Sequence, residues 1–344
     1  MSKNLKRFIA IVLVLATVLP VLSACGKVEE TPETTTVPLA TEPEEEAKVL
    51  KVLTLGHSLA VNTGHMLALI AATEGFENLV VGTLYYSGCP LSKHVEFAAS
   101  DAPVYNLYLS STATPTVTPE IMNDVTMKDA LQHDYWDIIV MQGGVFEVAK
   151  DETYTNGNIQ TIQAYVNKHK LADWAIFAWH MPWAFPTDND LRDTKGEPNG
   201  YYTNYEPYGH NRVNFYNAMT SCVEKYIMTD DTFEFLIPTG TAIECAVSSY
   251  MTEKDIFRDY AHAGDFGILL AGYVWYCKLA GIDHLDDLKI ESVPRQFLRT
   301  KPTNQAWVLT QAEKDIILEA VNNALKTPLK LTESQYKTAP ATAG

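Results

Sequence analysis

Three residues far apart in the sequence are of the types that carry out acyl transfer. Ser58 directly follows an apolar run, and an Asp-x-x-His pattern formed by Asp259 and His262 precedes a helical pattern late in the chain. A serine hydroxyl becomes an effective nucleophile when a histidine takes its proton, and an aspartate beside that histidine fixes the imidazole tautomer. These residue types predict Ser58 as nucleophile, His262 as general base and Asp259 as the orienting carboxylate.

Two further positions offer hydrogen-bond donors for the negative charge that develops in such a reaction. Gly88 lies in a Ser-Gly-Cys-Pro sequence after a second apolar run, and Gln142 follows a third. A backbone N–H and a carboxamide N–H can both stabilise an oxyanion, so Gly88 and Gln142 are the candidate oxyanion hole. Each residue alone also has a plainer explanation. Ser58 fits a helix cap, Gly88 a turn, and Gln142 a satisfied polar residue at a strand end.

His180 and Trp183 follow a fourth apolar run and are therefore expected at the same edge of the sheet. They fit either the wall of a substrate pocket or a packed aromatic cluster. The segment 182–209 that begins there is rich in Pro, Gly, Asp, Asn and aromatic residues and has no helical or strand period. Its aromatic side chains suit stacking on sugar rings, or they form a small core of the segment itself.

The apolar runs alternate with helical patterns along the chain. Strands are predicted at 49–55, 79–84, 136–141, 174–179 and 235–237. Helices are predicted at 59–73, 158–170, 212–227, 268–279 and from a Thr310/Glu313 capping box to 325. The stretch 88–126 is less regular and predicts loops and small elements.

Such alternation predicts the α/β class, as a three-layer α/β/α sandwich with a flavodoxin-like central parallel sheet of about five strands. Ligand sites of such sheets lie outside the carboxyl ends of the strands. The candidate residues all follow predicted strands or precede the 268–279 helix, so the fold would gather them at one edge.

The order of these residues resembles the SGNH, or GDSL-like, hydrolase superfamily over residues 49–280. In that superfamily a Gly-Asp-Ser or Gly-Asn-Ser ends the first strand, a glycine follows the second, an amide side chain follows the third, and Asp-x-x-His lies near the end. The resemblance implies the fold above and the roles given to Ser58, Gly88, Gln142, Asp259 and His262. The sequences at 136–142 and 179–183 look like a branch catalogued only as a domain of unknown function.

Two departures from the superfamily pattern leave a second function open. His57 stands where an Asp or Asn usually precedes the nucleophile, and Gln142 stands where an Asn is usual. They leave open a non-catalytic surface protein that binds a glycan or solute on the same fold. An α/β-hydrolase is disfavoured because the chain has no Gly-x-Ser-x-Gly sequence.

The first 48 residues predict export and a lipid anchor. Basic residues precede an apolar run at 8–22 that is short for a membrane span, and Leu-Ser-Ala-Cys at 22–25 resembles the bacterial lipobox. We expect a signal peptide over 1–24, lipidation of Cys25 and a disordered acidic linker over 25–48. The hydrolase-like domain is then expected at 49–326 and a C-terminal tail at 327–344.

Charge and cysteine content exclude several classes of partner. The formal net charge is −16 with no basic stripe, which argues against nucleic acid and against contact with anionic lipid other than through the anchor. Cys89, Cys222, Cys245 and Cys277 are widely spaced without C-x-x-C, so mostly free thiols and no metal site are expected.

Taken together, the sequence predicts an extracytoplasmic, membrane-anchored lipoprotein that works without a cofactor. Its expected activity is hydrolysis of a carboxylic ester. The expected substrate carries O-acyl groups and is a polysaccharide or a small molecule.

Overall fold

The computed structural model describes residues 48–144, 146–186, 205–294 and 306–339. The chain divides into two compact units, residues 1–48 and 49–344, and the description below concerns the second. The predicted signal peptide, Cys25 and nearly all of the linker lie outside the described residues, as does most of the 182–209 segment. Within the described residues, none of the helices is both long and apolar enough to cross a bilayer.

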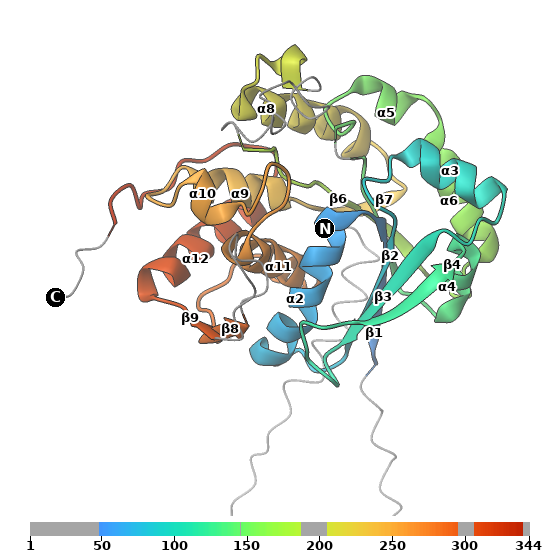
Figure 1. Ribbon diagram of the computed structural model, residues 1–344, viewed down its shortest axis with the longest axis horizontal. Helices are drawn as coiled ribbons and strands as arrows, with labels where there is room; N and C mark the ends of the chain where they lie inside the picture. Colours follow the sequence, from blue (N-terminus) through green and yellow to red (C-terminus); the bar gives the residue numbers. More distant parts are fainter. Residues whose placement is uncertain (1–47, 145, 187–204, 295–305, 340–344) are drawn as a thin grey trace, which may run out of the picture. The chain divides into compact units, whose positions relative to one another are not determined.

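A seven-stranded sheet forms the centre of the second unit, with the strand order β4-β3-β2-β1-β5-β6-β7 (Figure 1). The strands are β1 (Leu50–Gly56), β2 (Leu79–Tyr85), β3 (Tyr105–Ser111), β4 (Glu120–Val125), β5 (Ile138–Met141), β6 (Ile176–His180) and β7 (Phe233–Ile237). The five strands from β2 to β7 in the sheet order are mutually parallel. Their order is the doubly wound, flavodoxin-like one, which confirms the predicted three-layer fold.

The two additional strands come from the stretch that was expected to hold only loops and small elements. β3 runs antiparallel to β2, and β4 runs antiparallel to β3 at the edge of the sheet. β4 is exposed over most of its length, so its residues carry no strand-like alternation of apolar and polar side chains. The prediction of about five strands was therefore correct for the parallel part alone.

Helices cover both faces of the sheet. They are α2 (Ser58–Glu74), α3 (Leu91–Ala99), α4 (Met127–His133), α5 (Asp151–Thr155), α6 (Asn158–His169), α8 (Arg212–Cys222), α9 (Thr239–Val247), α10 (Glu253–Ile256), α11 (Asp265–Ala280) and α12 (Gln311–Lys326). A 3-10 turn, η2 (Glu206–Tyr208), precedes α8, and a π-helical turn, η3 (Val223–Ile227), extends it. A short antiparallel ribbon is formed by β8 (Ser292–Pro294) and β9 (Ala306–Val308).

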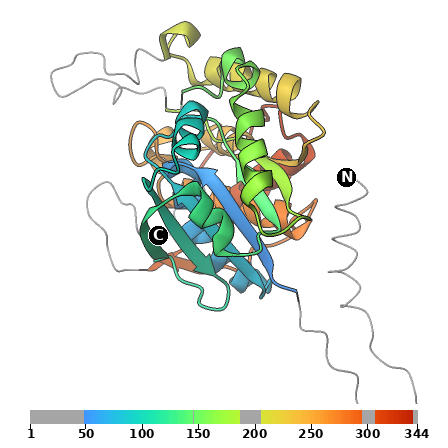
Figure 2. The same cartoon turned by 90° about the vertical axis from the view of Figure 1, so that its right-hand side faces the viewer.

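The helices form two layers. α2, α9, α11 and α12 pack against one another on one face, and α3, α4 and α6 pack on the other, which is turned toward the viewer in Figure 2. α11 is buried along nearly its whole length, from Asp265 to Cys277, because α2, α9 and α12 surround it. A helix that is apolar on all sides fits such a central position.

The residues after α12 pack on the domain and do not form the tail that was expected from 327 onward. Thr241 donates a hydrogen bond to the Pro328 carbonyl, and the N–H of Tyr250 donates to the Tyr336 carbonyl. Ser334 is buried against Glu319 of α12. The packed residues therefore extend at least to Tyr336, past the boundary expected at 326.

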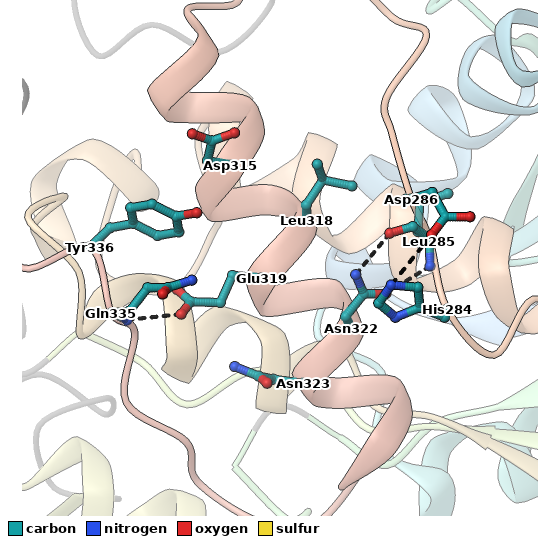
Figure 3. Close-up of a pocket in the computed structure, with 10 residues that line it drawn as sticks. All are labelled: His284, Leu285, Asp286, Asp315, Leu318, Glu319, Asn322, Asn323, Gln335 and Tyr336. Atoms are coloured by element: carbon teal, nitrogen blue, oxygen red, sulfur yellow. Dashed lines mark hydrogen bonds and ion pairs between the residues drawn. The ribbon is translucent and has the colours of Figure 1, made fainter.

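The same C-terminal residues close one side of a polar pocket with a volume of about 260 Å³ (Figure 3). α12, the segment 284–286 and residues 335–336 line it. The Asn322 side chain pairs with both the N–H and the carbonyl of Leu285, and so holds that segment against α12. None of the residues singled out above for acyl transfer lines this pocket.

Candidate active site

Ser58 lies at the junction of β1 and α2. β1 ends at Gly56, His57 is the N-cap residue in an extended conformation, and Ser58 is the first residue of the helix and is half-buried. The N–H of a first helical residue has no acceptor within its own helix, so the Ser58 N–H is available to a ligand. The helix dipole adds positive potential at this point, which favours a developing negative charge.

The structure brings Ser58, His262 and Asp259 together over a sequence separation of about two hundred residues. His262 Nε2 lies 2.9 Å from Ser58 Oγ. His262 Nδ1 lies 3.0 and 2.9 Å from the two carboxylate oxygens of Asp259. Because a carboxylate can only accept, Nδ1 carries the ring proton, and the free lone pair of Nε2 faces the serine hydroxyl. This is the geometry in which an imidazole can take the serine proton.

Asp259 is held in its ionised form. Partial desolvation raises its pKa, but hydrogen bonds from the His262 ring and from the N–H groups of Ala261 and His262 outweigh that effect and lower the pKa to about 2. Arg258 Nε lies 3.6 Å from the same carboxylate and adds a favourable charge. The carboxylate therefore stays charged at every pH at which the protein is expected to work.

A tight loop between α10 and α11 presents Asp259 and His262. The Arg258 N–H donates to the His262 carbonyl at 3.0 Å, and the Gly264 N–H donates to the Ile256 carbonyl at 2.8 Å. From outside the loop, the indole N–H of Trp183 donates to the Ala261 carbonyl at 2.9 Å. The loop is thus closed at its base and held near its tip by a residue that follows β6.

The turn after β2 places Gly88 beside the end of β1. The Tyr86 N–H donates to the Gly56 carbonyl at 3.3 Å, and the Cys89 N–H closes a turn on the Tyr86 carbonyl. Gly88 has a φ of 59° and is exposed, with no atom within 4 Å of the place where a Cβ would be. The left-handed backbone explains the glycine, and no acceptor among the described residues binds its N–H.

Gln142 follows β5 and belongs to a buried hydrogen-bonded chain. Its Oε1 lies 2.8 Å from His180 Nδ1, and His180 Nε2 lies 2.8 Å from the hydroxyl of Thr239, the first residue of α9. Burial, with a contribution from His57, lowers the pKa of His180 to about 3, so the ring is neutral. When Nδ1–H donates to Gln142 Oε1, Nε2 can accept from the Thr239 hydroxyl only if that hydroxyl turns away from the Met181 carbonyl, which also lies 2.8 Å from it.

This arrangement fixes the orientation of the Gln142 amide and leaves its nitrogen unused. Gln142 Nε2 is buried and has no hydrogen-bond partner among the described residues. It lies 2.8 Å from the position that a Cβ on Gly56 would take, so position 56 has room only for glycine. An unpaired buried donor costs stability. Gln142 is fully buried against the Gly56 backbone, so a substrate oxygen reaches this donor only if the nucleophile turn shifts.

His180 and Trp183 do not form a pocket wall, because both side chains are fully buried. His180 instead orients Gln142, and Trp183 holds the loop that carries His262. Thr239 was not among the residues expected at the site, and it lies at the start of a helix that had not been predicted. Its position directly after the β7 run is the signal that could have drawn attention to it.

Part of the 182–209 segment forms a small aromatic core. Tyr205 is stacked on Phe215 of α8, and its hydroxyl bonds to the backbone of Phe185. Phe185, Tyr205 and Phe215 are all fully buried. Residues 187–204, with Tyr201 and Tyr202, lie outside the described residues, and the sugar-stacking hypothesis for them stays a prediction.

All four cysteines after Cys25 are free and buried, in agreement with the expectation of free thiols. Burial raises the pKa of Cys89 and of Cys277 to about 12 and that of Cys222 to about 11. No cluster of three or more His, Cys, Asp or Glu side chains within the described ranges is arranged to hold a metal ion.

Comparisons with known proteins place the chain in a family. A DUF4886 family protein from Bacteroides uniformis has a similar structure, with a TM-score of 0.67 and 20% sequence identity over 83% of this chain and 98% of that one. A protein from Slackia heliotrinireducens, named as a candidate SGNH hydrolase, matches with a TM-score of only 0.38 and 16% identity over 67% of this chain and 98% of that one. No curated protein matches the chain. The family model described as "Domain of unknown function (DUF4886)" matches residues 51–300, and the chain therefore belongs to that family.

Proposed function

We propose that the protein is a serine hydrolase of the cell surface that removes O-acyl groups, with carbohydrate as the acylated substrate. The observation that carries the proposal is the hydrogen-bonded series from Ser58 Oγ through His262 to Asp259. The alternative is a binding protein on the same fold. Binding alone does not require the Ser58 hydroxyl to face one nitrogen of an imidazole whose other nitrogen is bound by a carboxylate.

In the proposed reaction, Ser58 Oγ attacks the carbonyl carbon of an ester while His262 Nε2 takes the hydroxyl proton. The carbonyl oxygen becomes an oxyanion, for which the N–H groups of Ser58 and Gly88 are the accessible donors and the buried Gln142 amide is a third candidate. His262 then returns the proton to the leaving alcohol, and the acyl group stays on Ser58. A water molecule, activated by the same imidazole, releases the acid.

The carbohydrate part of the proposal has a different basis from the chemistry. It is supported by the resemblance of the sequence to the SGNH superfamily and by the expected anchor at Cys25. No cofactor enters any step, and the reaction requires only the substrate and water.

The test compares the wild type with Ser58→Ala and with Ser100→Ala, an exposed serine at the end of α3 that serves as a matched control. A fluorophosphonate probe is expected to label the wild type and the control and to spare Ser58→Ala. Hydrolysis of p-nitrophenyl acetate should fall by ~1,000-fold or more in Ser58→Ala. When catalytic residues act as a unit, removing one of them costs nearly as much turnover as removing all of them. Equal labelling of all three proteins, or unchanged hydrolysis by Ser58→Ala, would show that Ser58 is not the nucleophile.

A further inference from the structure

His57 occupies the position between β1 and the candidate nucleophile, and its imidazole is fully buried. Nε2 lies 3.1 Å from the carbonyl oxygen of Gly143, and Nδ1 lies 3.4 Å from the backbone nitrogen of Leu59. One neutral tautomer satisfies both contacts, because Nε2–H donates to the carbonyl while Nδ1 accepts from the amide. Burial lowers the pKa of His57 to about 4 against the opposing effect of the bond to Gly143, and His262 lowers it further. The ring is therefore neutral near pH 7.

The two contacts of His57 are not equivalent. The contact to Leu59 is long for a hydrogen bond, whereas the contact to Gly143 has an ordinary length. Short side chains such as Asp, Asn and Ser are the preferred helix caps, so capping alone does not call for an imidazole. The ring extends past the capping position and reaches the loop after β5. Its stronger contact therefore links the loop that carries Ser58 to the loop that carries Gln142.

The linked carbonyl belongs to the residue directly after Gln142. The Gln142 side chain lies between the Gly56 backbone on one side and His180 on the other. Its nitrogen is the buried donor without a partner. The bond from His57 thus fixes the backbone next to the Gln142 side-chain amide. An amide that stabilises an oxyanion must be placed to within about half an ångström.

We infer that His57 is a positioning residue, whose hydrogen bond to Gly143 sets the place of the Gln142 amide relative to Ser58. The inference rests on the proposed hydrolase function. His57 touches neither the substrate nor the reacting atoms and acts through Gln142. A shorter side chain at position 57 keeps the cap on α2 but ends short of Gly143.

The kinetic test is a double-mutant cycle of His57→Asn and Gln142→Ala, with His284→Asn as the matched control on an exposed histidine. Asn preserves the cap and removes the link. His57→Asn is expected to lower kcat by ~10- to 100-fold with little change in KM. The upper end of this range is the loss in kcat that follows when one oxyanion donor is removed. In the Gln142→Ala background the same change should cost less than about 3-fold, because the residue through which His57 acts is already absent. His284→Asn should match the wild type.

A second readout does not depend on turnover. The side-chain amide resonances of Gln142, assigned by their loss in Gln142→Ala, are expected to shift or broaden in His57→Asn and to stay unchanged in His284→Asn. If the kcat losses of the two single variants multiply in the double variant, the inference is overturned. It is also overturned if the Gln142 resonances stay unchanged in His57→Asn. If the wild type neither hydrolyses the ester nor reacts with the fluorophosphonate, the proposed function fails, and the resonances still decide whether His57 positions Gln142.

Discussion

At the scale of single residues, the surroundings of each histidine decide what it can do. His57, His94 and His180 are fully buried, and desolvation lowers their pKa values to about 4, 3 and 3. They are neutral hydrogen-bonding groups. His262 is only partly buried, with 21% of its side chain exposed, and it is bound to an ionised carboxylate. It is also the one of these four imidazoles that contacts the Ser58 hydroxyl.

The three buried histidines make the folded protein sensitive to acid. Between about pH 6.5 and pH 4 each of them is protonated in the unfolded chain and neutral in the folded one, so folding stability falls as the pH falls. Each contributes about 1.4 kcal/mol per pH unit in that window, which gives about 4 kcal/mol per unit for the three. Glu244 opposes this trend, because burial raises its pKa to about 7 against the effect of Arg212. A net slope of about 3 kcal/mol per pH unit is expected.

Chemical denaturation followed by circular dichroism at pH 6.5, 5.5 and 4.5 measures this slope. Stability that is constant over the three pH values would show that the buried imidazoles are protonated in the folded state. Histidine resonances provide an internal check. Those of His57, His94 and His180 should not titrate before the protein unfolds.

The candidate site could be predicted from the sequence only in part. Ser58, Asp259 and His262 were found because their residue types and order limit the chemistry, and the sheet gathers strand ends. The contacts of His180 and Trp183 could not be found in the same way. The partners of a side chain after a strand depend on which strands lie beside it, and the neighbours of β6 are β5 and β7. Only the folded order shows that His180 meets Gln142 and Thr239.

At the scale of elements, the short segment after β6 supports both halves of the site. His180 at the end of β6 orients Gln142, and Trp183 three residues later binds the loop of Asp259 and His262. A single stretch of backbone thus sets the distance between the candidate oxyanion donor and the candidate base. Gly240 packs so closely on this stretch that a Cβ would lie 2.2 Å from the Pro182 carbonyl oxygen, which leaves the segment little freedom.

Trp183→Phe tests this support. The change removes the indole N–H and leaves the Ala261 carbonyl unsatisfied in a buried place, at a cost of about 1–3 kcal/mol. We expect slower fluorophosphonate labelling and a lower kcat at temperatures well below the unfolding transition. Trp174→Phe is the matched control, because Trp174 is 55% exposed before β6, at the opposite end of that strand. If both variants react at the wild-type rate, the loop of Asp259 and His262 does not depend on Trp183.

The helices that were predicted correctly have eleven residues or more, and the strands that were predicted correctly are the mostly buried parallel ones. Five α-helices of the described residues were missed, each with nine residues or fewer and each close behind a turn or strand: α3, α4, α5, α9 and α10. In such short elements tertiary contacts outweigh local pattern. α9, for example, is buried along eight of its residues because it packs on α11 and α12.

At the scale of the whole molecule, the proposed place of work depends on Cys25. If Cys25 is diacylated, its acyl chains add about 0.8 kcal/mol per buried methylene and hold the protein at a membrane. Cys25→Ser is expected to move the protein from the detergent phase to the aqueous phase or to leave it unprocessed. Ser23→Ala is the control, since a small residue remains at that position and processing should continue. A processed, detergent-phase Cys25→Ser protein would contradict the proposed anchor.

The burial of the four thiols has a consequence for how the chain must fold. A raised pKa and a closed core keep Cys89, Cys222, Cys245 and Cys277 from reacting in the native state, but neither protection exists before the core closes. For a chain that folds after export, the interval between crossing the membrane and closing the core is the period in which these thiols meet oxidants. Disulfide formation takes seconds to hours, whereas compact domains commonly fold in less time. If the chain is exported as proposed, closure of the core before the thiols are oxidised would keep it free of wrong cross-links.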